Sequence, residues 1–361
     1  MRRFLRGHDE SGARVHGGPH DAELQALGVT AGALLDFSSS TNPYGPHPAV
    51  LEALRTAAVD RYPDSSALRA RQALGGLLGI PATELVLGNG AADLLWTLAR
   101  CLLGSSDRAL IVEPTFSEFR AAARACGAGL DEWRAVAEAE FALDLSAIAE
   151  RARASGASVI YLCSPNTPTG SACSATEIQS WATRHSELMI VLDQSFLTLS
   201  ECYADATVSM PENVVRVRSL TKDHGIPGAR VGYLLGSAEL CRAVECNRPA
   251  WTTSAFAQAA TLACVQHDDF VRESREQLLR DRRELARELA AIGIETLPSR
   301  TTFLLARAPR VSELRVRLLS ENQILVRDCE SFGLPGFMRL AAKPANERAR
   351  LIAALRGRSR C

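Results

Sequence analysis

Short apolar runs alternate with longer amphipathic stretches through the first two thirds of the chain. The apolar runs have strand length, and several of the stretches between them place apolar residues at helical spacing. Continuous apolar strands separated by helices predict a mainly parallel sheet covered on both faces, so the expected fold class is α/β. The expected strands are Glu84–Gly88, Ala109–Val112, Ser158–Cys163, Met189–Asp193, Val214–Val217 and Arg230–Leu235, and the clearest helices are Ala91–Leu103, Ser117–Cys126 and Ala175–His185.

The pattern changes after Trp251. The remaining residues hold one long charged amphipathic helix, two strand candidates and a final helix, at about Asp268–Ile292, Thr302–Ala306, Gln323–Val326 and Asn346–Arg356. This order of elements predicts a second, smaller α+β domain. We therefore expect an N-terminal segment (1–45) that packs with the small domain, a large domain (46–250) and a small C-terminal domain (251–361).

Forty-one basic side chains balance forty-one acidic ones among the 361 residues. A chain without net charge has no general field for nucleic acid or an anionic membrane, so we expect neither as a partner. No apolar run approaches the roughly 20 residues of a membrane span, and the first residues lack the apolar core of a signal peptide. The ten cysteines are irregularly spaced without a CxxC pair, which favours reduced thiols in a cytoplasmic protein over a disulfide framework or a metal site.

Only two of the basic residues are lysines, Lys222 and Lys343. Lys222 follows a predicted strand in the segment Ser219-Leu-Thr-Lys222, and Arg230 lies eight residues further on. Open α/β sheets bind ligands at the carboxyl ends of their strands, so we expect Lys222 on a loop at such a site. A desolvated primary amine condenses with an aldehyde, and the nearby hydroxyl and guanidinium groups suit one phosphate. Most lysines are simply solvated at the surface, and we expect Lys343 to be one of those.

Four further segments carry groups that suit a flat, phosphorylated cofactor. The turn Gly88-Asn-Gly90-Ala91-Ala92 joins a strand to a helix whose free N–H groups can bind phosphate, although many such turns are plain connections. Asp193 closes an apolar strand, where it either pairs with a ring nitrogen or caps the strand end. Asn166 in a turn-rich loop can donate to a ring oxygen and Phe116 can stack on a ring, although turn and core roles are the common ones.

The order of these groups along the chain is more informative than any one of them. It runs as a phosphate-binding turn, a stacking aromatic, an amide, an acid, a lysine and an arginine. In this order the chain resembles the aspartate aminotransferase superfamily, the fold-type I enzymes that use pyridoxal 5'-phosphate (PLP). The resemblance covers residues 15–356. It is strongest to the threonine-phosphate decarboxylases of cobalamin biosynthesis, followed by the histidinol-phosphate aminotransferases.

Several short motifs carry this resemblance. Val15-His16-Gly17-Gly18 and the segment from Leu35-Asp-Phe-Ser38 to Asn42-Pro43 resemble the decarboxylases, and Phe196 stands where aminotransferases usually have a tyrosine. Arg61-Tyr62-Pro-Asp64 is similar to the family's RYPD motif, whose tyrosine reaches the cofactor phosphate of the neighbouring subunit, so a homodimer is implied. Two C-terminal segments resemble arginine motifs that bind the substrate's anionic groups, Ile324-Leu-Val-Arg327-Asp-Cys329 and Met338-Arg339-Leu340.

The resemblance implies a role for each matching residue. Lys222 would carry the cofactor as a Schiff base and move protons, and Asp193 would pair with the pyridine nitrogen, so these two are the expected catalytic residues. The other implied cofactor contacts are Gly90, Ala91, Ala92, Phe116, Asn166, Ser219, Arg230 and, reaching in from the neighbouring subunit, Tyr62. The implied contacts to a small phosphorylated, amino-acid-like substrate are His16, Gly17, Ser40, Arg327 and Arg339. Planar guanidinium groups suit both its phosphate and its carboxylate.

Other positions differ from the family pattern. Ser40 replaces an asparagine that the decarboxylases use for substrate, and Pro19 follows the HGG motif in place of an asparagine. The sequence Asp193-Gln-Ser195 stands in place of the usual Asp-Glu-Ala, Asp223-His224 replaces an aromatic pair, and Thr167 replaces the second asparagine of many relatives. These differences leave the expected cofactor contacts intact and bear mainly on the substrate.

Three functions are open at this point. The HGG and DFS motifs and Phe196 favour a decarboxylase that converts L-threonine O-3-phosphate to (R)-1-amino-2-propanol O-2-phosphate. The alternative is an aminotransferase of the histidinol-phosphate type, in which the Cα–H bond rather than the bond to the carboxylate stands perpendicular to the cofactor ring. A regulatory PLP-binding domain of the kind fused to DNA readers is the third, but no basic stripe supports it.

Overall fold

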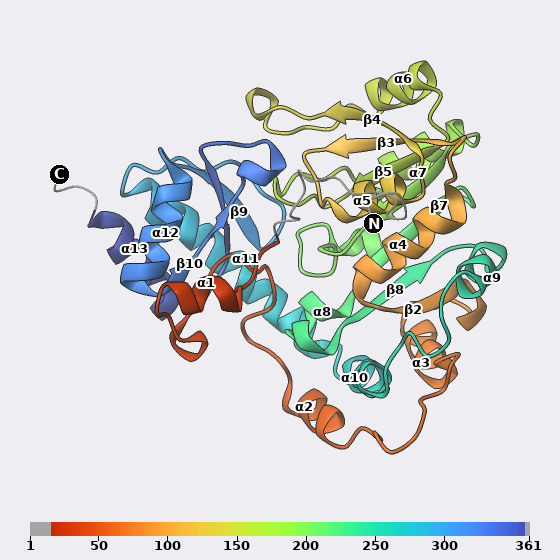
Figure 1. Cartoon of the computed structure of the whole chain (residues 1–361), viewed down its shortest axis with the longest axis horizontal. Helices are drawn as coiled ribbons and strands as arrows, with labels where there is room; N and C mark the ends of the chain where they lie inside the picture. Colours follow the sequence, from red (N-terminus) through yellow and green to blue (C-terminus); the bar gives the residue numbers. More distant parts are fainter. Residues whose placement is uncertain (1–15, 358–361) are drawn as a thin grey trace, which may run out of the picture.

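The computed structural model of the chain describes residues 16–357, so Val15 of the N-terminal motif lies outside the described residues. The largest sheet has seven strands in the order β2-β8-β7-β6-β5-β3-β4 (Figure 1). Its neighbouring strands are parallel except where β8 pairs with β2 and with β7. The strands are β2 (Leu85–Asn89), β3 (Arg108–Glu113), β4 (Gly129–Arg134), β5 (Val159–Cys163), β6 (Met189–Asp193), β7 (Val214–Ser219) and β8 (Val231–Leu235). All six strands expected here are present, which confirms the α/β prediction; β4 is an additional edge strand.

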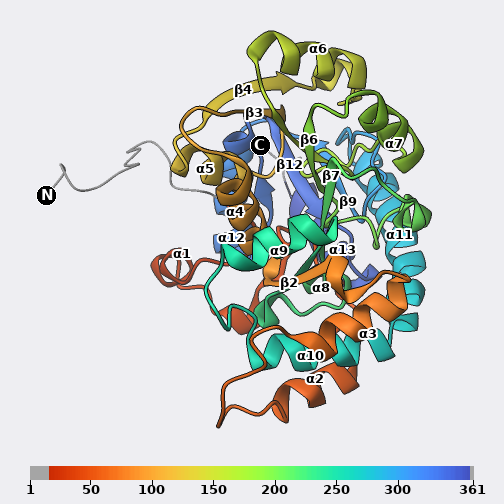
Figure 2. The same cartoon turned by 90° about the vertical axis from the view of Figure 1, so that its right-hand side faces the viewer.

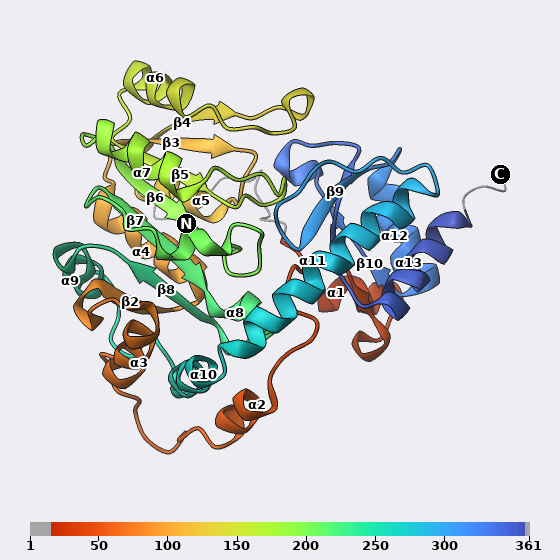
Figure 3. The same cartoon turned by 180° about the vertical axis from the view of Figure 1, so that it is seen from behind.

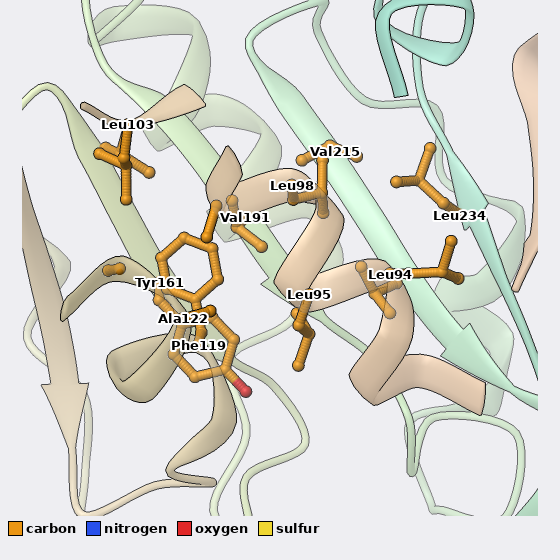
Figure 4. Close-up of a cluster of buried hydrophobic side chains, with 14 of the residues drawn as sticks. Leu94, Leu95, Leu98, Leu103, Phe119, Ala122, Tyr161, Val191, Val215 and Leu234 are labelled. Atoms are coloured by element: carbon orange, nitrogen blue, oxygen red, sulfur yellow. The ribbon is translucent and has the colours of Figure 1, made fainter. Parts of the chain in front are cut away.

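Alternate residues of the central strands enter two different cores. Tyr161 of β5 lies in a cluster with leucines of α4 and with Phe119 of α5 (Figure 4), whereas its neighbour Ile160 lies in a cluster with Trp181 of α7. Successive side chains of a strand point to opposite faces, so a sheet covered on both faces needs apolar residues at consecutive positions. The helices of these two layers are α4 (Gly90–Leu102) and α5 (Glu118–Ala125) on one face, and α6 (Leu145–Ser155) and α7 (Ala175–Arg184) on the other.

A third helical group covers the end of the sheet formed by β2 and β8. Leu87 and Tyr233 of these strands belong to one buried cluster with Leu74 of α3 and Ala260 of α10. Figure 2 shows α2, α3 and α10 gathered together at one end of the molecule. The elements are α2 (Pro48–Arg55), α3 (Leu68–Leu78) and α10 (Ala255–Gln266), and α9 (Ala238–Cys246) precedes α10 in the chain.

The C-terminal residues form a smaller unit around a three-stranded antiparallel sheet. Its strand order is β11-β12-β9, and a separate parallel pair joins β1 to β10 with Leu35 opposite Ile324. In Figure 1 this unit lies beside the seven-stranded sheet, together with the N-terminal helix α1. Its elements are α1 (Asp21–Ala26), β1 (Leu35–Asp36), β9 (Phe303–Arg307), α12 (Val311–Asn322), β10 (Ile324–Leu325), β11 (Arg327–Asp328), β12 (Phe337–Ala341) and α13 (Ala345–Arg356).

The pairing of β1 with β10 supports packing of the N-terminal segment with the C-terminal part, and the boundaries 1–45, 46–250 and 251–361 stay a prediction. The long helix α11 (Asp269–Ala290) runs from the neighbourhood of α8 (Leu220–Asp223) and α10 toward β9 (Figure 3). None of the helices between residues 16 and 357 combines the length and the apolarity needed to cross a bilayer.

Candidate active site

A cavity of about 480 Å³ lies where the carboxyl ends of β6 and β7 face the N-terminal segment and the C-terminal sheet. This volume lies within the range of sites that hold a cofactor or small ligand. The cavity brings together residues from most of the segments that the sequence singled out. The predicted site residues that line it are His16, Gly17, Ser40, Ala91, Ala92, Phe116, Asp193, Ser219, Lys222, Arg230, Arg327 and Arg339.

Lys222 lies in the cavity wall just beyond the end of β7. The expectation of a loop there was wrong, because the residues after Ser219 form the single turn of α8. The Lys222 Nζ atom stands 3.8 Å from the centre of the Phe196 ring. Burial lowers the pKa of the Lys222 ammonium, and the nearby Asp193 carboxylate opposes this shift. The neutral amine, which is the nucleophilic form, is therefore favoured more than in a solvated lysine.

Asp193 ends β6 and is only 3% exposed. The Tyr161 hydroxyl donates a hydrogen bond to Asp193 Oδ2 at 2.9 Å, and the Ser195 backbone N–H donates to Oδ1 at 2.9 Å. Burial, followed by the charge of Asp193, raises the pKa of Tyr161 well above its ordinary value, so this phenol stays a donor. Both carboxylate oxygens are thus held in a defined direction at the cavity wall.

The start of α4 lines the cavity with groups that can bind an anion. Asn89 at the N-cap makes no side-chain cap hydrogen bond, so the first N–H groups of the helix lack that acceptor. Gly90 has a φ of +80°, and a Cβ there would collide with the Arg230 guanidinium. A Cβ at Gly232 of β8 would likewise collide with the backbone nitrogen of Ala91. These two glycines let α4, β8 and Arg230 approach one another closely.

Two arginines from the C-terminal sheet line the same cavity. Arg327 of β11 and Arg339 of β12 are directly paired in the sheet register, and their residues are 4% and 7% exposed. Arg339 donates to Thr167 Oγ1 at 2.6 Å and to the Ser38 carbonyl oxygen, while its Nε has no partner among residues 16–357. Burial lowers the pKa of Arg339 to about 10, which leaves it cationic at neutral pH. A buried cation held by neutral acceptors is suited to an anionic ligand.

The N-terminal segment closes one side of the cavity through His16. His16 Nε2 lies 2.9 Å from Glu118 Oε1, and Trp96 Nε1 donates to Glu118 Oε2 at 2.6 Å. The His16 ring is 5.4 Å from the ring of Phe116. Glu118 is buried and lines the cavity, but in the sequence nothing distinguishes it from any other acidic residue in the first turn of a helix.

Three predicted cofactor contacts do not line the cavity, namely Gly90, Asn166 and Tyr62. The Asn166 amide donates to the Pro114 carbonyl oxygen at 2.8 Å and to Thr169 Oγ1 at 2.9 Å, and its oxygen accepts from Thr115. Tyr62 is 79% exposed and stacks on Trp251 at 4.7 Å between ring centres. All three roles therefore stay predictions, and that of Tyr62 requires a second subunit.

Tyr161, Ser195 and Thr221 belong to the site without having been predicted. Ser195 and Thr221 line the cavity, and Tyr161 holds Asp193 from inside the sheet. A hydroxyl in an otherwise apolar buried strand needs a partner, and this signal could have identified Tyr161. In the sequence Ser195 is only a departure from the family pattern.

Asp223 lies next to Lys222 but outside the cavity lining. It is 4% exposed, and its Oδ1 has no hydrogen-bond partner among the described residues. Burial raises the pKa of the Asp223 carboxyl to about 7. The neighbouring His224 is also buried, and burial lowers its pKa to about 4. The turn that carries Lys222 is thus followed by two groups that are favoured in their neutral forms.

A family model described as aminotransferase class I and II matches residues 33–355. Similar curated proteins include histidinol-phosphate aminotransferase 1 from Thiobacillus denitrificans, which is 31% identical over 350 residues that cover 94% of this chain and 89% of the relative. Histidinol-phosphate aminotransferase from Symbiobacterium thermophilum is 30% identical and covers 95% of this chain and 94% of its own length.

Two solved structures have the same fold. Histidinol-phosphate aminotransferase from Sinorhizobium meliloti, in complex with pyridoxal-5'-phosphate, superimposes with a TM-score of 0.85 at 24% identity and covers 96% of this chain and 95% of its own. L-threonine-O-3-phosphate decarboxylase from Porphyromonas gingivalis gives a TM-score of 0.77 at 24% identity. The match covers 89% of this chain and 98% of the decarboxylase chain. At these identities the two structures inform the fold and not the reaction.

Replacing Tyr161 by Phe removes one of the two donors to Asp193. A lost hydrogen bond to a buried carboxylate costs about 1–2 kcal/mol, so we expect the dissociation constant for PLP to rise roughly 5- to 30-fold. Equilibrium dialysis measures this constant. Tyr233→Phe is the matched control, because Tyr233 is equally buried in the same sheet and lies outside the cavity lining. Equal PLP affinity in the two variants would contradict the role of Tyr161.

The raised pKa of Asp223 predicts a pH dependence of stability. Because the folded-state pKa is about 7 and the ordinary value is 3.8, its contribution to stability is complete below pH 4 and is lost as pH rises through 7. Between pH 5 and pH 8 the free energy of unfolding should fall by about 1–3 kcal/mol more in the wild type than in Asp223→Asn. Urea denaturation of the unloaded proteins measures this difference, with Asp60→Asn as an exposed control. Parallel pH curves for wild type and Asp223→Asn would refute the prediction.

Proposed function

This chain belongs to the aminotransferase class I and II family, and we propose that it transfers the amino group of a small phosphorylated amine, of the histidinol-phosphate type, to a keto acid. The observation that carries this proposal is the identity of 30–31% to histidinol-phosphate aminotransferases along 94–95% of the chain. The sequence alone favoured decarboxylation of L-threonine O-3-phosphate, and these relatives favour the alternative that was kept beside it.

Enzymes of this family depend on PLP, and the residues of the cavity fit that cofactor. Lys222 offers a partly neutral amine for its aldehyde, Asp193 offers an oriented carboxylate for its pyridine nitrogen, and the start of α4 with Arg230 offers donors for its phosphate. Phe116 lines the same cavity and can cover a ring face. When bound, PLP supplies an electron sink for the bond that is broken at the substrate's α carbon.

The protein's own groups then account for binding and proton movement. Arg327 and Arg339 hold the anionic groups of the substrate. Gly17 lies beside the Arg339 guanidinium, and His16 and Ser40 line the same cavity. Arg339 is preorganised because Thr167 and Ser38 fix its guanidinium before substrate arrives. Lys222 Nζ takes a proton from the substrate's α carbon and gives it up again later in the reaction. Taking the proton requires the neutral amine, which burial favours.

Phe196 favours decarboxylation as a second candidate. Its ring lies against Lys222 Nζ and it has no hydroxyl, and a phenylalanine here is the feature that the sequence shares with the decarboxylases. Two buried arginines also suit a substrate that carries both a phosphate and a carboxylate, as L-threonine O-3-phosphate does.

We further propose a cytoplasmic homodimer in which Tyr62 reaches the cofactor phosphate in the neighbouring subunit. Tyr62, Trp251 and Phe256 are apolar groups that remain 79%, 49% and 44% exposed in the single chain. Large exposed aromatic side chains of this kind suit a protein interface. A groove with Phe256 on one side also includes Arg230, which connects this face to the cofactor cavity.

The reaction is decided by identifying products. Purified PLP-loaded protein is mixed with histidinol phosphate plus 2-oxoglutarate, and separately with L-threonine O-3-phosphate. The proposal predicts glutamate formation that requires both components of the first mixture. Release of CO₂ from the second mixture without a keto acid, and no glutamate from the first, would replace it with the decarboxylase.

Hybrid dimers test the position of Tyr62. A site that combines Lys222 of one chain with Tyr62 of the other is intact in the hybrid of Lys222→Ala and Tyr62→Ala chains. Mixing the two inactive parents should therefore recover about a quarter of the wild-type activity, because random pairing gives one intact site in every second dimer. No recovery, although mass measurement shows that hybrids have formed, would mean that Tyr62 serves its own subunit's site or none.

A further inference from the structure

Glu118 is a buried carboxylate in the wall of a cavity that holds several cationic side chains. The residue is 7% exposed, and it lines the cavity together with Arg327 and Arg339. An acidic group close to an anionic substrate would repel that substrate unless its charge is already engaged. Both carboxylate oxygens are engaged within the protein, since Oε1 accepts from His16 Nε2 at 2.9 Å and Oε2 accepts from Trp96 Nε1 at 2.6 Å.

The two partners of Glu118 differ in how firmly the fold holds them. Glu118 is the first residue of α5, and the next residue, Phe119, is fully buried in a core cluster of the seven-stranded sheet. Trp96 lies on α4, which packs in the same cluster. His16, in contrast, lies in a segment (16–20) that has neither helix nor strand. Glu118 therefore joins a rigid part of the fold to a segment that depends on individual contacts for its position.

Gly17 and Gly18 continue this segment toward Arg339. A Cβ at Gly17 would stand 2.5 Å from the Ser38 carbonyl oxygen and 3.2 Å from Arg339 Nη2, so the backbone approaches both groups closely. The Gly18 N–H donates to Ser38 Oγ at 2.8 Å, and the Ser38 carbonyl oxygen accepts from Arg339. The segment thus runs from Glu118 to Arg339, and of these contacts the one with Glu118 ties it to the helices of the large sheet.

We propose that Glu118 is a positioning residue, which strengthens substrate binding by holding His16 and the two glycines after it in the cavity wall. Its carboxylate oxygens serve His16 and Trp96, and the substrate meets the residues that Glu118 holds. A preformed wall loses less conformational freedom when the substrate binds. The effect on substrate affinity rests on the proposed function, whereas the anchoring of the segment does not depend on which reaction the protein catalyses.

Hydrogen exchange of the PLP-loaded protein tests the anchoring directly. Glu118→Leu removes the acceptor at similar side-chain size, so the backbone N–H groups of Gly17 and Gly18 should exchange about 5- to 30-fold faster, as expected when one hydrogen bond to a charged group is lost. Mass spectrometry of the peptide that contains both glycines measures this rate. Glu239→Leu is the matched control, because Glu239 is an exposed acid in the first turn of α9. Unchanged exchange in Glu118→Leu would overturn the inference.

Steady-state kinetics test the consequence for the substrate. Glu118→Leu should raise KM for histidinol phosphate about 5- to 30-fold, change kcat much less and leave the dissociation constant for PLP unchanged. Glu118→Gln keeps an acceptor oxygen, so its KM should lie between those of the wild type and Glu118→Leu. If PLP affinity or kcat falls in the same proportion as KM rises, Glu118 supports the fold or the cofactor, and the inference fails.

Combining Glu118→Leu with His16→Ala separates positioning from direct contact with the substrate. If Glu118 acts through His16, the double variant should have the same KM as His16→Ala alone, because the carboxylate then has no ring to hold. A further rise in KM in the double variant would mean that Glu118 meets the substrate itself, which contradicts the positioning role. A protein that does not transaminate, but whose Gly17 and Gly18 exchange faster in Glu118→Leu, would support the positioning role and remove the proposed reaction.

Discussion

The parallel pairing of β6 with β7 is the constraint on which the cavity depends. In this register Asp193 lies opposite Val217, so the carboxylate that ends one strand stands beside the point where the next strand leads into α8. Lys222 follows five residues later, within one helical turn of that edge. Asp193 and Lys222, which come from different segments, are thereby held on the wall of the same cavity. The apolar packing on both faces of the sheet keeps the two strands in place. A shift of register by one residue would point Asp193 into the opposite core.

The cavity concentrates positive charge although the chain as a whole is neutral. Arg230, Arg327, Arg339 and Lys222 all line it, against the carboxylates of Asp193 and Glu118. Burial disfavours the charges of Lys222, Arg327 and Arg339 unless an anion arrives. The same desolvation that makes Lys222 nucleophilic therefore also makes the two buried arginines receptive to phosphate and carboxylate. Cofactor and substrate are both anionic, and one physical environment therefore serves binding and chemistry together.

Much of the sheet and most of the site residues followed from the sequence, because central strands buried on both faces leave an unbroken apolar signal. The apolar pattern does not predict the edge strand β4, because Gly129–Arg134 is only partly buried and its composition is polar. The sequence does not predict the short helix at Lys222, because a single turn has no periodicity to detect. Glu118 and Tyr161 were missed for another reason: their roles arise from partners 102 and 32 residues away, which only the folded chain brings into contact. The role predicted for Asn166 comes from a motif. The hydrogen bonds that its amide makes within the protein depend on the fold, and a motif does not show them.

The central claim is that the Lys222 amine, and no other amine of the chain, holds the cofactor. The small number of lysines allows a direct test of this claim. The chain has only two lysines, so Lys343 is an internal control on the same molecule. The PLP-loaded protein is reduced with borohydride, digested and mapped by mass spectrometry for the pyridoxyl group. The account predicts one added group per chain, on Lys222, and none on Lys343. A label on Lys343, or no label on a protein that has bound PLP, would contradict it.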